Sequence, residues 1–121
     1  MTVLFVEYPK CSTCKKAKAW LDEHGVECID RNIVTDNPTA DELATWIARS
    51  GLPVRRFFNS SGMKYRELGL KARLDAGMTD QECYELLATD GMLVKRPLLV
   101  GDDFVLVGFR EAEWESRLKT R

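Results

Sequence analysis

The residues of this chain with the clearest chemical potential are two closely spaced cysteines, in the segment Cys11-Ser12-Thr13-Cys14. They follow an apolar run, Thr2–Glu7, that predicts a buried strand, and they open a segment of helix formers, Thr13–His24. Free N–H groups and the positive end of the dipole at a helix start stabilise a thiolate. We therefore expect Cys11 to be an activated nucleophile and Cys14, one helical turn further on, to be its resolving partner.

The residues next to the two cysteines also fit a helix start with an anionic Cys11. Ser12 and Thr13 are candidates for the N-cap of the helix. Lys15 and Lys16 add positive potential beside the thiols, which favours the anionic form of Cys11.

Two other interpretations of the pair stay open. A zinc site needs a second close pair of ligands, but Cys28 and Cys83 are far apart in the sequence and His24 is the single histidine. The pair could also be two core cysteines that fall together by coincidence. We expect no metal site, we expect Cys28 and Cys83 to pack in the core, and we interpret His24 as a favourable cation at a helix end.

The bulk composition describes one globular domain, residues 1–121. Hydrophobic residues make up 45% and charged residues 31%. The net charge of −1 lacks the positive excess that is typical of proteins that bind nucleic acid directly. No signal peptide and no apolar run near the ~20 residues of a membrane helix is visible. A cytoplasmic location, in which thiols stay reduced, is therefore expected.

The order of predicted elements indicates an α/β sandwich with a mixed four-stranded sheet. A strand, a helix and a strand open the chain as a βαβ unit, helices fill the middle, and a hairpin and a final helix close it. Two capping boxes, Thr39–Glu42 and Thr79–Glu82, mark the starts of middle helices. The remaining predicted elements are a strand at Val26–Ile33, a short helix at Met63–Leu70, strands at Leu98–Val100 and Phe104–Val107, and a helix from Phe109 to Arg121. Residues 52–62 are expected to form an irregular exposed loop or short turns.

A second group of residues, Lys95-Arg96-Pro97, stands just before the hairpin. Proline has no N–H to donate, so Pro97 should begin its strand or lie in a turn. On the residues alone, Arg96 is expected to be a solvated side chain.

Taken in order, these residues resemble the family of the arsenate reductases (ArsC), Spx and MgsR. The match runs from Val3 to about Leu118. It implies a thioredoxin-like fold with a helical insertion at about residues 39–92, and a cis Pro97 facing the cysteine loop. The matching segments are Cys11-Ser12-Thr13-Cys14-Lys15-Lys16-Ala17, Trp20-Leu21, Gly25, Arg31-Asn32-Ile33, Thr39 with Glu42-Leu43, Lys95-Arg96-Pro97-Leu98 and Val107-Gly108-Phe109.

The resemblance also implies roles. Cys11 would attack arsenate and form a thiol–arsenic adduct that glutathione and glutaredoxin reduce, and Arg96 would bind the oxyanion. Ser12, Thr13 and Lys15 at the helix start, together with Pro97, would complete the binding site for an oxyanion or other substrate.

The sequence departs from the arsenate reductases at three positions. Two further arginines of those enzymes fall at Asn59 and Gly108, although Arg55, Arg56, Arg66 or Arg110 could reach the site instead. The third departure is Cys14, which single-cysteine reductases lack and Spx-type proteins carry as part of a redox switch.

Two functions follow from the resemblance. The favoured one is a thiol oxidoreductase acting on arsenate or a disulfide, with no bound cofactor and with glutathione and glutaredoxin, or thioredoxin, as reductant. The alternative is an Spx-like redox-sensing regulator that binds RNA polymerase through the C-terminal domain of its alpha chain; Gly51 lies close to the position of a contact glycine of Spx.

Overall fold

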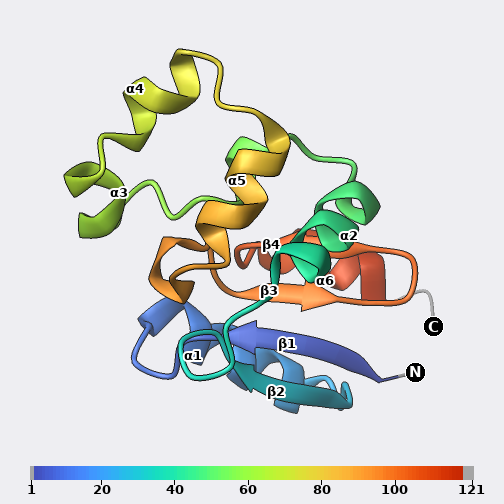
Figure 1. The fold of residues 1–121 in the computed structure, drawn as a ribbon. Helices are drawn as coiled ribbons and strands as arrows, with labels where there is room; N and C mark the ends of the chain where they lie inside the picture. Colours follow the sequence, from blue (N-terminus) through green and yellow to red (C-terminus); the bar gives the residue numbers. More distant parts are fainter. Residues whose placement is uncertain (1, 119–121) are drawn as a thin grey trace.

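The computed structural model describes residues 2–118, which form a four-stranded sheet covered by helices (Figure 1). The strands are ordered β2-β1-β3-β4, with β1 and β2 parallel and both other pairings antiparallel. The mixed four-stranded sheet expected from the element order is therefore confirmed. Its strands are β1 (Val3–Glu7), β2 (Cys28–Asn32), β3 (Leu98–Val100) and β4 (Val105–Val107).

Helices fill the chain in the expected order. Two short elements were not predicted: α4 and the 3-10 helix η2. The 3-10 helix η1 lies within residues 52–62, where short turns were one expectation, but the expected exposure is wrong in part, because Phe57 and Phe58 are buried in the core. The final helix begins two residues later than expected, and the predicted part of it at residues 119–121 lies outside the described residues. The helices are α1 (Ser12–Glu23), α2 (Ala40–Ser50), η1 (Val54–Phe57), α3 (Met63–Glu67), α4 (Leu70–Asp75), α5 (Asp80–Leu87), η2 (Gly91–Leu93) and α6 (Glu111–Leu118).

The two faces of the sheet pack against different helices, because successive side chains of a strand point to opposite sides. On one face Phe5 and Leu99 meet Trp114 of α6 and the apolar side of α1. The other face packs beneath α2 and α5 and includes Val6 (Figure 1). The loops that carry the candidate site lie at the end of β1 and at the start of β3, two neighbouring strands of this sheet.

The segment between β2 and β3 holds α2, α3, α4 and α5, in the region where the resemblance implies a helical insertion. Helices α3 and α4 lie farthest from the sheet (Figure 1). Both predicted capping boxes are present: Thr39 and Thr79 each accept a hydrogen bond from the backbone of the glutamate three residues on, and the glutamate side chain accepts one from the threonine backbone in return. No helix within residues 2–118 is long and apolar enough to cross a membrane.

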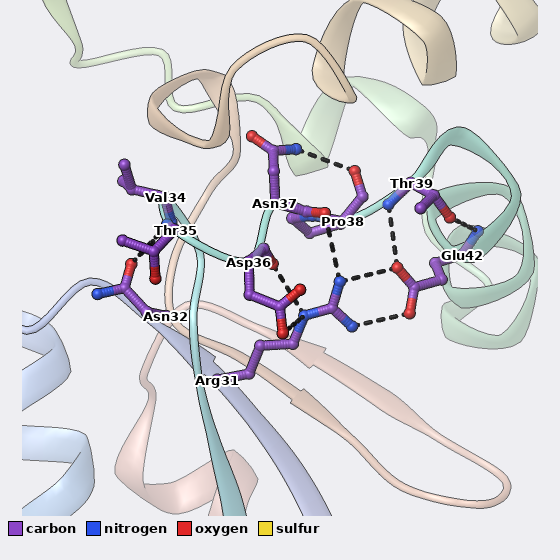
Figure 2. Close-up of polar contacts among 9 residues, drawn as sticks. All are labelled: Arg31, Asn32, Val34, Thr35, Asp36, Asn37, Pro38, Thr39 and Glu42. Carbon is purple, nitrogen blue, oxygen red and sulfur yellow. Dashed lines mark hydrogen bonds and ion pairs between the residues drawn. The ribbon is translucent and has the colours of Figure 1, made fainter.

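A polar network fixes the path from β2 into α2 (Figure 2). The guanidinium of Arg31 donates two parallel hydrogen bonds to the Glu42 carboxylate, at 2.7 and 2.8 Å. It also donates to the backbone carbonyls of Asp36 and Asn37. Because Glu42 is at the same time the capping-box partner of Thr39, one carboxylate anchors both the strand end and the helix start.

Candidate active site

Cys11 occupies the N-cap position of α1. Its backbone is extended, with φ −89° and ψ 125°, and its carbonyl accepts the first helical hydrogen bond, from Lys15 N–H at 3.0 Å. The expectation that Ser12 or Thr13 caps the helix is wrong, because the helix begins at Ser12 and both side chains are exposed. The thiol therefore stands where the side-chain acceptor of a helix cap normally stands.

The local hydrogen bonds favour a thiolate at Cys11. Partial burial acts to raise the pKa of the thiol, but the net effect is a pKa below the ordinary value of 9.0. The backbone N–H and thiol of Cys14, the backbone N–H of Thr13 and the charge of Arg96 all lower it. This is the thiolate stabilisation at a helix start that the cysteine spacing predicts.

Cys14 has the opposite environment. Its side chain is fully buried, and its sulfur accepts a hydrogen bond from the backbone N–H of Tyr8 at 3.5 Å. Burial raises the pKa of the Cys14 thiol to about 12, and its hydrogen bond to Cys11 and the charges of Cys11 and Glu7 act in the same direction. Cys11 and Cys14 are both free thiols here, so the structure holds the reduced form of the pair.

A buried acid lies behind the cysteine pair. Glu7, the last residue of β1, has only 5% of its surface exposed. Burial raises its pKa to about 7, with further contributions from a hydrogen bond to Asp30 and repulsion by the same residue. Lys18 of α1 forms an ion pair with Asp30 at 2.9 Å and so closes the cluster on its outer side.

Arg96 and Pro97 lie on the loop before β3. The peptide bond between them is cis, as the resemblance implies. The Arg96 guanidinium lies 5.2 Å from the ring centre of Tyr8 and donates to the Met92 carbonyl at 3.4 Å. Arg96 is thus a partly buried side chain held against the cysteine loop, and the expectation of a merely solvated arginine is wrong.

A cavity of about 260 Å³ opens beside the cysteine loop. We call it the basic pocket, because four of its lining side chains are cationic. Besides Arg96 these include Arg56 and Arg110, two of the four arginines considered able to replace the missing ones. The other two are placed elsewhere: Arg55 forms an ion pair with Asp75, and Arg66 lines a different cavity. The pocket is lined by Thr13, Arg56, Lys95, Arg96, Val107, Gly108, Phe109 and Arg110.

The remaining predicted residues fall as follows. Ser12, Thr13 and Lys15 are exposed on the first turn of α1. Cys83 is fully buried in the core as expected, whereas Cys28 is only half-buried at the margin of a core cluster. His24 ends α1, where its Nδ1 lies 2.8 Å from the Trp20 carbonyl and its ring stacks on the Trp20 ring.

Two residues of this region were not predicted as site residues: Glu7 and Tyr8. Strand alternation could have identified Glu7, since it lies on the same face of β1 as the buried Val3 and Phe5. Tyr8 carried no comparable signal. Among residues 2–118 there is no group of three or more His, Cys, Asp or Glu side chains that could hold a metal ion.

Comparisons with known proteins point to one family with this fold and this cysteine loop. The family model described as the ArsC family matches residues 6–117. The chain belongs to the ArsC family, and its fold is that of the thioredoxin-like ArsC proteins.

Solved structures extend the similarity over nearly the whole chain. An ArsC family related protein from Bacteroides fragilis is 57% identical and superposes with a TM-score of 0.92, covering 96% of this chain and 97% of that one. A "possible arsenate reductase" from Streptococcus mutans UA159 is 43% identical with a TM-score of 0.87, covering 96% and 98% of the two chains.

Curated relatives include a close and a more distant group. The uncharacterised protein YusI of Bacillus subtilis strain 168 is 50% identical over 116 residues, or 96% of this chain and 98% of YusI. The global transcriptional regulator Spx of Staphylococcus epidermidis is 29% identical over 113 residues, or 93% of this chain and 83% of Spx. The family therefore contains both proteins named as reductases and proteins named as regulators.

Proposed function

We propose that this chain is a thiol oxidoreductase in which Cys11 is the nucleophile and Cys14 the resolving thiol. The observation that supports this most strongly is the opposite shift of the pKa values of two thiols within one helical turn. The pKa of Cys11 is lowered, while burial raises the pKa of Cys14 to about 12. A partly exposed thiolate next to a protonated, buried thiol is the arrangement that lets the first cysteine attack a substrate and the second resolve the adduct.

The substrate in this proposal is arsenate or a disulfide. Arg96 would bind an oxyanion or polarise a departing thiolate, since a guanidinium matches such groups in charge and geometry. Ser12, Thr13 and Lys15 at the start of α1, with Pro97 beside Arg96, would complete the substrate site. Glutathione with glutaredoxin, or thioredoxin, would return the cysteine pair to its reduced form in the cytoplasm, without a bound cofactor.

The test is a thiol titration followed by two assays on the same sample. The rate of Cys11 alkylation by iodoacetamide, measured against pH, should reveal a thiolate below pH 9. Arsenate and oxidised glutathione are then offered separately. Cys11→Ser should abolish turnover, and Cys14→Ser should accumulate a mixed adduct that mass spectrometry detects.

The chain offers a matched control in Cys28, a half-buried cysteine whose pKa burial raises. Cys28→Ser should retain both alkylation and turnover. If Cys11→Ser is as active as the natural protein, or if no disulfide forms between Cys11 and Cys14 under oxidising conditions, the proposed function is wrong.

A second candidate function is redox-sensing regulation of the Spx kind. It is favoured by the relatives named as transcriptional regulators or as a regulatory protein, at 27–29% identity, and by the cysteine pair itself. The glycine expected at the contact position, Gly51, ends α2 with a φ of 72°, which gives it a helix-capping role whatever else it does. The test is a pull-down with the C-terminal domain of the RNA polymerase alpha chain: binding by the reduced or the oxidised protein would favour this candidate, and no binding in either state removes it.

A further inference from the structure

The cations of the basic pocket have no carboxylate partners among residues 2–118. Ion pairs in this part of the chain involve other cations, such as Lys18, Arg31 and Arg55. The whole chain carries a slight excess of acidic residues, so the clustering of Arg56, Lys95, Arg96 and Arg110 is local. Four like charges around one cavity repel one another, and an anion bound between them offsets that repulsion.

The positive surface continues beyond this cavity. A second hollow, of about 240 Å³, shares Arg56, Val107 and Arg110 with the basic pocket and adds Arg49 and Arg117. Its acidic lining residues are Asp103 and Glu113. Each hollow far exceeds the roughly 30 Å³ that one water occupies, so the two together have room for much more than a four-oxygen oxyanion.

The pocket is also joined to the reactive thiol. Thr13, whose backbone N–H donates to Cys11, lines the pocket, and so does Arg96, whose charge acts on Cys11. A ligand in the pocket would therefore have one end within reach of the thiol. Of common anionic groups, a carboxylate is the one that a small organic thiol carries and that a guanidinium binds through two parallel hydrogen bonds.

We propose that the basic pocket binds the carboxylates of the substrate and that the substrate class is a small organic disulfide whose thiol halves are acidic. This inference rests on the proposed function and deepens it by choosing among its substrates. Arg56 and Arg110 then serve as specificity residues that hold the carboxylates while the disulfide sulfur faces Cys11.

The reaction that follows is a balanced two-electron exchange. The Cys11 thiolate attacks one sulfur of the disulfide, an S–S bond forms between Cys11 and that half, and the other half leaves as a thiolate. Cys14 then loses its proton and its sulfur attacks Cys11. The second half leaves as a thiolate that takes up a proton, so the substrate is reduced to two thiols and the cysteine pair is oxidised to a disulfide.

The experiment compares oxidised glutathione, a disulfide with carboxylates, with cystamine, a disulfide with amines in their place. The quantity measured is the ratio of kcat/KM for the two substrates, with reduced thioredoxin as the electron donor and the rate without this protein subtracted, because glutathione as donor would give no net reaction with its own disulfide. We expect the natural protein to prefer oxidised glutathione by about ten-fold or more, the range that a charged hydrogen bond provides, and the preference to shrink as salt rises.

The decisive variant is the double charge reversal Arg56→Glu with Arg110→Glu, which should invert or abolish the preference. The double variant Arg56→Lys with Arg110→Lys should keep part of the preference for oxidised glutathione, because the positive charges remain while the two parallel hydrogen bonds of each guanidinium are lost. The matched control is Lys71→Glu, which reverses a charge on a side chain that is 80% exposed and lies outside the pocket. Circular dichroism verifies that each variant is folded.

The outcomes separate the two proposals. If both disulfides are reduced equally well, or if the double reversal keeps the natural ratio, the inference about the pocket is wrong while the proposed function stands. If arsenate alone is reduced, the substrate class is likewise wrong. If nothing is reduced and Cys11 and Cys14 form no disulfide, the proposed function itself has failed, and the inference fails with it.

Discussion

Replacing Glu7 by glutamine should make the protein more stable at neutral and alkaline pH. Glu7 is the buried acid at the end of β1, and the costs of burying its charge and of placing it beside Asp30 raise its pKa to about 7 from the ordinary 4.5. Glutamine has nearly the same shape and can still donate a hydrogen bond to Asp30, but it cannot ionise.

The magnitude follows from linkage between protonation and folding. Between pH 4.5 and about 7 the folded protein binds more protons at Glu7 than the unfolded chain does, so the free energy of unfolding falls as pH rises through this window. A shift of this size corresponds to about 3 kcal/mol at ~1.36 kcal/mol per pKa unit. The contribution of Asp30, whose lowered pKa matters as pH falls below 3.8, lies outside the window.

The assay is urea unfolding at pH 5, 6, 7 and 8, followed by tryptophan fluorescence in the presence of a reductant. At pH 5 the Glu7→Gln variant and the natural protein should be nearly equal, and by pH 8 the variant should be the more stable by up to about 3 kcal/mol. Because Cys11 is present in both proteins, its own ionisation largely cancels in the comparison. An exposed glutamate at the far end of α1, Glu23, supplies the control variant Glu23→Gln, which should follow the natural profile.

Two results would refute this reasoning. One is a natural protein whose stability is unchanged or higher at pH 8 than at pH 5. The other is a Glu7→Gln variant whose profile runs parallel to that of the natural protein at every pH. In either case folding would not raise the pKa of Glu7.

Three further predictions concern the frame around the site. Glu42→Gln should lower the free energy of unfolding by about 1–2 kcal/mol at pH 7, after discounting for partial exposure. The Arg31 hydrogen bonds lower the Glu42 pKa to about 2 because they stabilise only the anion, so this deficit should vanish as pH falls toward 2. Urea unfolding at a series of pH values measures it. Thr79→Ala should lower stability by about 1 kcal/mol through loss of the capping box at α5, with the exposed Thr35, which caps no helix, supplying the control Thr35→Ala. Gly91→Ala should destabilise the fold by more than about 2 kcal/mol, since the added Cβ collides with the Ile33 backbone carbonyl, and an unchanged melting temperature would contradict that packing.

Much of the fold could be predicted from the sequence because its signals are local. The apolar run before the cysteines, the two capping boxes and the hairpin residues each specify an element within a few positions. Cys83, on the apolar side of a capped helix, was assigned to the core correctly for the same reason. The 3-10 helix η2 was not predicted, because a 3-10 turn needs no periodic pattern that a sequence could reveal.

The candidate site could be predicted only in part, because much of it is assembled by long-range contacts. The loop with Cys11 was identifiable as one contiguous segment. Four arginines were candidates for the pocket beside it, and only long-range packing selects Arg56 and Arg110, which are distant in sequence. Likewise the proximity of Glu7 to Asp30 depends on the register of β1 against β2, which pairs Glu7 with Asn32 and leaves Asp30 diagonal to it on the same face.

Two charged groups, the predicted Arg96 and the unpredicted Glu7, act on the cysteine pair in opposite directions. The cationic Arg96 lowers the pKa of Cys11, while the carboxyl group of Glu7 contributes to the raised pKa of Cys14. Burial and helix-start hydrogen bonds already separate the two thiols, and the charges on the two sides increase that separation. The order of reaction, Cys11 first and Cys14 second, is therefore set by the whole surroundings of the helix start rather than by the spacing of the cysteines alone. By the same logic, Glu7→Gln should lower the pKa of Cys14 and narrow the difference between the thiols, while leaving the cations of the basic pocket in place.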